Sequence, residues 1–289
     1  MAALLFGVST PLSKPLALEM SPLWLAGFFY TGSLLGILPG FFPRLGMRPA
    51  STASFLSIGV LERAEKVALA ASILIGGVVA PVLLVIGLTR FPASRGSLLM
   101  NAESVFTVLF AYILYRERMT LRLMVGAALG STGCAVASLN HASGGSGGAL
   151  FFLSAALLWA LDTNILRVLS GVNPLAVTVW KGIGSALFLI PAAALTGPPP
   201  HSPVLVLWAL VVGSFGYGFS LVCFLRSIRG IGVSRTGAWF GFSPFIGAVL
   251  SIALLKEPVT PAFLIASVIL LLAVLTLQGF RMPRVKRTS

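Results

Sequence analysis

The sequence predicts an all-α integral membrane protein, and three observations carry this prediction. Apolar residues make up 57% of the 289-residue chain and charged residues only 9%, whereas soluble domains carry about 25% charge. Stretches of about 20 apolar residues, the length that crosses a hydrocarbon core, recur along the chain. Turn-forming Gly, Pro and Asn residues separate the stretches. With only seven acidic residues, the chain lacks the polar surface that a soluble domain of this length needs.

Ten stretches are long enough to form transmembrane helices. They span residues 1–18, 22–41, 66–89, 93–115, 121–140, 148–170, 174–196, 203–225, 233–255 and 261–280. The two cysteines lie inside apolar runs, which does not indicate a disulfide framework. Neither a cofactor motif nor a Cys/His metal cluster is visible in the sequence, so we expect no cofactor and no metal.

The basic residues predict the orientation of the helices. Fifteen Lys and Arg residues fall on one side of the predicted membrane and four on the other, and the twentieth, Lys181, lies inside a span. Because cytoplasmic loops carry the excess of positive charge, both termini are expected in the cytoplasm. The net charge of +13 lies at the ends of apolar runs, so the lipid bilayer, and not nucleic acid, is the expected partner.

The chain contains an internal repeat, which divides it into residues 1–140 and 148–281. The segment 2–7 resembles 155–160 in sequence, and three matches lie 140 residues apart: Ser94-Arg95 with Ser234-Arg235, Glu117 with Glu257, and Thr120 with Thr260. Each half holds five predicted helices, and an odd number requires the second half to be inverted. Inverted repeats are typical of secondary transporters. The alternative is that the duplication has only a structural role and serves to build a bundle of helices.

Two segments carry a family resemblance. Residues 93–106 with Arg116-Glu117-Arg118, and residues 234–245 with Lys256-Glu257-Pro258, resemble the hallmark of EamA domains in the drug/metabolite transporter superfamily. The resemblance implies two inverted five-helix halves around a central cavity that opens alternately to each side. It also implies a small-molecule substrate, such as an amino acid, another metabolite or a toxic compound, and often export. Ser104 departs from the Pro that the family usually has there.

Asp162 and Lys181 are predicted to form an ion pair inside the membrane. They lie on consecutive antiparallel helices, each nine to ten residues from the intervening turn, and therefore about 14 Å from it at the same depth. A charge at this depth needs a partner or water. There are two alternatives: the pair has only a structural role and holds the two helices together, or Lys181 forms no pair and reaches the cytoplasmic interface of the membrane. The repeat places Ser9 and Phe29 at the equivalent positions, so the pair is an asymmetric feature.

Glu103 is the third ionisable candidate, near the middle of the fourth span. It is a candidate proton carrier or contact for a cationic substrate; the alternative is a protonated structural residue. Further candidates for the substrate pathway are Asn101, Asn164, Trp159, Tyr217 and Trp239, each of which also has a structural interpretation. Arg95 and Arg235, at the starts of the fourth and ninth spans, are expected to anchor these helices at the membrane–water interface. The alternative is that they act as gates of the transport pathway.

The leading hypothesis is therefore that the chain is a secondary transporter, which exports a small amino-acid-like or drug-like metabolite. The expected setting is a bacterial cytoplasmic (inner) membrane, and the expected state is a monomer or homodimer. A non-transporting receptor or scaffold is the alternative, although the predicted tail is short. A membrane-embedded enzyme would need a nucleophile with a base, and the two histidines, His141 and His201, lie in loops.

Overall fold

The computed structural model describes residues 1–37, 61–116, 119–138, 147–231, 236 and 239–278, and within these ranges the regular elements are all helical. The helices are α1 (Ala2–Glu19), α2 (Pro22–Leu35), α4 (Arg63–Ser72), η3 (Ile73–Val79), α5 (Ala80–Arg90), α6 (Ala93–Leu99), α7 (Ala102–Tyr115), α8 (Leu121–Ser138), α9 (Gly147–Leu166), η4 (Val168–Gly171), α10 (Pro174–Thr196), α11 (Pro203–Val212), η5 (Gly213–Phe219), α12 (Ser220–Ile231), α14 (Ser243–Leu255) and α15 (Pro261–Gln278).

Six helical stretches in the described residues are long and apolar enough to cross a membrane. They are Arg63–Arg90, Ala93–Tyr115, Leu121–Ser138, Gly147–Leu166, Pro174–Thr196 and Pro203–Gly230, and two shorter apolar helices follow at Ser243–Leu255 and Pro261–Leu277. The chain is therefore a multi-pass membrane protein. Helices α1 and α2 overlap the first two predicted spans but are not among the six, so the total of ten crossings stays a prediction.

Several helix boundaries differ from the predicted spans. Helix α2 ends at Leu35, before the predicted end at residue 41, and residues 38–60 lie outside the described part. The fourth span is interrupted at Met100 and Asn101, which separate α6 from α7. The first residues of the predicted ninth span, 233–235, also lie outside the described part, and α14 begins at Ser243.

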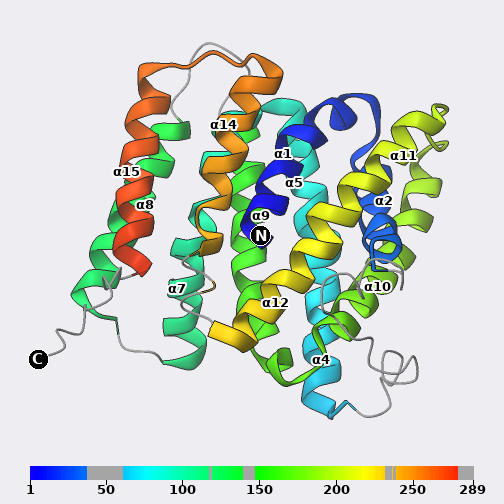
Figure 1. Cartoon of the computed structure of the whole chain (residues 1–289), viewed down its shortest axis with the longest axis horizontal. Helices are drawn as coiled ribbons and strands as arrows, with labels where there is room; N and C mark the ends of the chain where they lie inside the picture. Colours follow the sequence, from blue (N-terminus) through cyan, green and yellow to red (C-terminus); the bar gives the residue numbers. More distant parts are fainter. Residues whose placement is uncertain (38–60, 117–118, 139–146, 232–235, 237–238, 279–289) are drawn as a thin grey trace, which may run out of the picture.

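The helices pack around α1 and α9 at the centre of the molecule. Helix α1 packs against α14, η5 and α5, and α9 packs against α5, α7 and η3. Helices α8 and α15 stand side by side at one end of the molecule, while α2, α10 and α11 group at the other end (Figure 1). Helices from both halves of the sequence therefore surround the centre.

The spacing of 140 residues that relates the sequence motifs also relates unusual backbone features. The third and eighth predicted spans each contain a π-helical segment, η3 from Ile73 and η5 from Gly213. Helices α7 and α14 end at Arg116 and Lys256, which both adopt a left-handed conformation with φ of 53°. A non-glycine residue with positive φ is uncommon. Both pairs of features start 140 residues apart.

Apolar side chains lie both inside and outside the bundle. Phe29 and Phe152 are fully buried in the core, whereas large apolar side chains of α8 and α15 are exposed, among them Leu121, Leu264 and Leu272. Soluble monomers rarely expose extended apolar surfaces. In a bilayer, the same surface contacts lipid tails.

Candidate functional site

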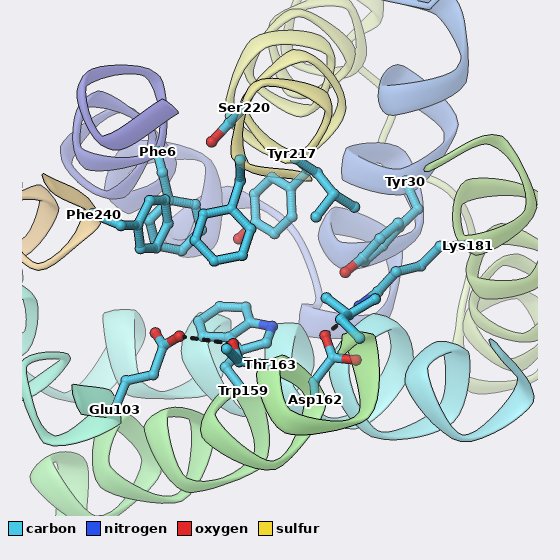
Figure 2. Close-up of a pocket in the computed structure, with 14 residues that line it drawn as sticks. Phe6, Tyr30, Glu103, Trp159, Asp162, Thr163, Lys181, Tyr217, Ser220 and Phe240 are labelled. Carbon is cyan, nitrogen blue, oxygen red and sulfur yellow. Dashed lines mark hydrogen bonds and ion pairs between the residues drawn. The ribbon is translucent and has the colours of Figure 1, made fainter. Parts of the chain in front are cut away.

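A cavity opens between helices of both halves of the chain. Its volume is about 80 Å³. Its lining residues are Phe6, Tyr30, Glu103, Trp159, Asp162, Thr163, Leu166, Lys181, Gly216, Tyr217, Ser220, Leu221, Phe224 and Phe240. Figure 2 shows Phe6, Tyr217 and Phe240 on one side of the space, and Trp159 with the two carboxylates, Glu103 and Asp162, on the other. The cavity combines apolar walls with a few charged groups, the usual composition of a small-molecule site.

The predicted ion pair between Asp162 and Lys181 is present and direct. Asp162 is 4% exposed and Lys181 is 3% exposed, and the Lys181 ammonium donates to Asp162 Oδ2. Ser72, at the end of α4, completes the cluster: its hydroxyl donates to Asp162 Oδ1 and accepts from Lys181 Nζ at 3.0 Å. Breaking such a pair on one side leaves an uncompensated buried charge, which is strongly destabilising.

Gly76 gives Asp162 the space that it occupies. A Cβ at Gly76 would lie 2.1 Å from Asp162 Oδ2, so no other residue fits beside the carboxylate. Gly76 lies in the π-helical segment η3, where the Ala80 N–H bonds to the Ile75 carbonyl. The next donor in this pattern would be the N–H of residue 81, but Pro81 has none. The Gly76 carbonyl instead accepts hydrogen bonds from the Tyr30 hydroxyl at 2.9 Å and from Trp159 Nε1 at 3.0 Å.

The substitution Gly76→Ala should therefore displace the Asp162 carboxylate and destabilise the protein by at least about 1–3 kcal/mol, the usual cost of overpacking. Thermal unfolding of the purified protein in lipid nanodiscs measures this effect. Gly230→Ala is the matched control, because a Cβ at Gly230 in α12 meets no atom within 4 Å. Equal melting temperatures for the two variants would contradict the packing described at Gly76.

The equivalent place in the other half of the chain has a different chemistry. Ser9 corresponds to Asp162, and a Cβ at Gly216 in η5 would lie 2.6 Å from Ser9 Cβ, as one at Gly76 would approach Asp162. Phe29 corresponds to Lys181 and stacks on Tyr217 at a centroid distance of 4.9 Å. One half therefore holds a charged cluster where the other half holds an aromatic one, so the charges of these two clusters lie on one side of the cavity.

Glu103 lies one residue into α7, just after the break in the fourth span. Its carboxylate accepts a hydrogen bond from the Thr163 hydroxyl at 3.4 Å. Among the residues that the structure describes, Glu103 forms no ion pair. Figure 2 shows its side chain beside Trp159, on the side of the cavity opposite Phe6 and Phe240.

Aromatic rings form much of the remaining wall. Phe6 makes edge contacts with Trp159 at 5.6 Å and with Tyr217 at 6.1 Å, and lies 5.4 Å from Phe240. The Tyr217 side chain is buried, and its hydroxyl has no hydrogen-bond partner among the described residues. Buried hydroxyl groups normally have a partner, and this oxygen is itself inaccessible, so an occupant of the cavity would reach it only after the wall rearranges.

The other three predicted candidates do not line the cavity. Asn101 donates to the Leu98 carbonyl at 3.1 Å, next to the break between α6 and α7. Asn164 donates to the carbonyls of Ala160 and Thr107, which ties α9 to α7. Trp239 is 65% exposed, so the structure gives no support for its predicted place in the cavity wall.

A second polar cluster joins the two halves where α14 leads into α15, at the top of Figure 1. Glu257 Oε1 and Oε2 accept hydrogen bonds from the backbone N–H groups of Ala93 and Ser94, each at 2.7 Å. The carboxylate thus caps the N-terminus of α6, where a negative charge is favourable. Arg95, which is buried, donates to Thr260 Oγ1 at 2.7 Å. We call Glu257, Arg95 and Thr260 the clasp.

Glu257→Ala should loosen this end of the bundle, because two backbone donors lose a charged acceptor worth about 1.5–3 kcal/mol for each bond. Hydrogen exchange at the first turn of α6 should become faster than in the wild-type protein. Glu19→Ala removes an exposed carboxylate at the end of α1 and should leave this exchange unchanged. Wild-type protection at Ala93 and Ser94 in the Glu257 variant would contradict the capping role.

Long apolar helices around a partly charged cavity are typical of membrane transporters. The comparison with known families agrees: the EamA-like transporter family matches residues 1–139 and again residues 146–278. The chain belongs to this family. Its relatives are named as transporters and not as enzymes.

Similar proteins cover most of the chain. A protein of Methanothermobacter thermautotrophicus named "Uncharacterized transporter" is 29% identical over 96% of this chain and 83% of its own length. A Salmonella typhimurium protein named "Probable amino-acid metabolite efflux pump" is 26% identical over 68% of this chain and 72% of its own. One crystal structure has a similar fold, with a TM-score of 0.64, 19% identity, and coverage of 95% of this chain and 93% of that one.

Proposed function

We propose that the chain is a secondary transporter that exports a small organic metabolite by alternating access. The observation that carries this proposal is the cavity between the two halves, whose lining includes the buried pair of Asp162 and Lys181 and the carboxylate of Glu103. Charged groups at membrane depth are costly and usually mark a substrate or ion pathway. The name of the Salmonella relative, an efflux pump, favours export.

The proposed architecture consists of two inverted five-helix halves, residues 1–140 and 148–281, with ten crossings in all. Both termini would face the cytoplasm of a bacterial cell, and the protein would lie in its inner membrane. The shared spacing of the π-helical segments and of the left-handed residues Arg116 and Lys256 supports the repeat. The excess of Lys and Arg on one side supports the orientation.

In the proposed mechanism, the two halves rock around the cavity. The clasp closes the end of the bundle at which α14 meets α15, since Glu257 and Thr260 belong to one half and the start of α6 to the other. Opening this end requires the clasp to break. Glu103 is the candidate proton carrier, because the carboxylate has no cationic partner among the described residues.

Comparison of the metabolites that leave cells tests the transport function. Cells that overproduce the wild-type chain should accumulate at least one small metabolite in the medium above the level of cells that produce the Glu103→Gln variant in equal amount. The vesicle-based uptake of that metabolite then measures transport directly. If no metabolite differs between the two strains, and vesicles with the purified chain move none of the metabolites of a cell extract, the proposal is wrong.

A further inference from the structure

We propose that the cavity binds a small organic cation, namely a protonated primary or secondary amine on an apolar body, with Glu103 as its counter-ion. This inference rests on the proposed transport function, which it deepens by naming the chemical class of the substrate. Two features of the cavity lining carry it: its charge balance and its aromatic rings.

The charges of the lining residues do not cancel. Among the described residues, Glu103, Asp162 and Lys181 are the side chains with a formal charge that line the cavity. Lys181 is bound to both Asp162 and Ser72, so these two charges neutralise each other. Glu103 is left with one weak contact, the Thr163 hydroxyl at 3.4 Å. When all three groups are ionised, the cavity carries one uncompensated negative charge, which one positive charge on the occupant would balance.

The rings around Glu103 suit an occupant with a cationic head and an apolar body. Phe6, Trp159 and Phe240 lie around the space that the Glu103 side chain faces (Figure 2). The face of an aromatic ring attracts an ammonium group within about 6 Å of its centre. The same rings exclude water, and so they favour an apolar body attached to the ammonium group and strengthen its attraction to the carboxylate.

An anionic substrate fits this lining less well. Lys181, the one cationic side chain of the lining in the part of the chain that the structure describes, already has its carboxylate partner. An acid or a zwitterionic amino acid would place a carboxylate into a space that already has a net negative charge, or would have to separate Lys181 from Asp162. The charge balance therefore favours a cation over an anion or a zwitterion.

Binding measurements on the whole chain in lipid nanodiscs test the inference with four probes on one ring. They are 2-phenylethylamine as the cation, 2-phenylethanol as the neutral form, 3-phenylpropionate as the anion and phenylalanine as the zwitterion. The amine should bind at least about tenfold more tightly than each of the others. Glu103→Gln should weaken binding of the amine about 10- to 100-fold, the loss expected for one hydrogen bond between charged groups.

Glu62→Gln is the matched control, because Glu62 is an exposed residue at the start of α4 and does not line the cavity. This variant should bind the amine like the wild-type chain. The inference is overturned if the anion or the zwitterion binds as tightly as the amine, if the amine shows no saturable binding at millimolar concentrations, or if Glu103→Gln binds it unchanged. If the chain exports an anionic metabolite and this export depends on Glu103, the proposed amine substrate is wrong but the transport function stands. If the chain exports no metabolite, the transport function itself is wrong.

Discussion

Lys181→Met should destabilise the folded protein by about 3–5 kcal/mol, because it leaves the Asp162 carboxylate buried without its cation. Asp162 would keep the Ser72 hydroxyl as its remaining donor, and one neutral hydrogen bond does not replace a charge. Chemical or thermal unfolding of the purified variant in nanodiscs measures the loss. Transport should fall with it, since the cluster forms part of the cavity wall.

The double variant Asp162→Asn with Lys181→Met separates stability from function. Removal of both charges takes away the unpaired group, so most of the lost stability should return, while transport should stay impaired if the charges act in the pathway. Lys66→Met, at an exposed position of α4, serves as the control for loss of a positive charge. A single Lys181→Met variant as stable as this control would contradict the buried pair.

Glu103→Gln should reduce transport to the level of vesicles without protein and leave stability within about 1 kcal/mol of the wild-type value. Glutamine has nearly the same shape and can still accept the hydrogen bond from Thr163, so the fold loses little. Unlike the glutamate, glutamine carries no negative charge and does not take up and release a proton. Flux in vesicles that contain equal amounts of each protein checks the result, with Glu19→Gln as the exposed control. Wild-type flux from the Glu103 variant would contradict its place in the pathway.

Much of the fold follows from the sequence, because apolar length and turn residues determine where helices can cross a membrane. The seventh predicted span, 174–196, has the bounds of α10. The breaks inside spans were not predictable from hydropathy. The π-helical segments η3 and η5 and the interruption at Met100 depend on packing between helices, which the hydrophobic pattern of one helix does not contain.

The candidate site was predictable where the residue type was unusual for a membrane span. Asp162, Lys181 and Glu103 stand out because charge is rare at that depth, and the symmetric spacing about one turn predicted the pair. Ser72, Gly76 and Tyr30 were missed, since small and aromatic residues are common in membrane helices. The sequence holds one signal for this part of the site. Pro81 has no N–H, and together with the neighbouring glycines this indicates that a carbonyl about one turn earlier lacks its usual helical partner.

The clasp was also only partly predictable from the sequence. The repeat identified Glu257 and Thr260 as matched positions, and Arg95 was expected to anchor the interface. The sequence did not indicate that the Glu257 carboxylate caps α6 of the other half, because that contact depends on how the two halves meet. Trp239 was selected by residue type alone, and its side chain is exposed.

Labelling of a single thiol in the cavity tests the central claim, that this cavity is the transport pathway. Leu221 lines the cavity, is partly exposed, and can be changed to Cys after both native cysteines, Cys134 and Cys223, are replaced by Ala. A membrane-impermeant maleimide should react with Leu221→Cys from either face of sealed vesicles and should block flux, and a transported solute should slow the reaction. A thiol that reacts with neither face, or that is fully labelled while flux continues at the unlabelled rate, would contradict the claim.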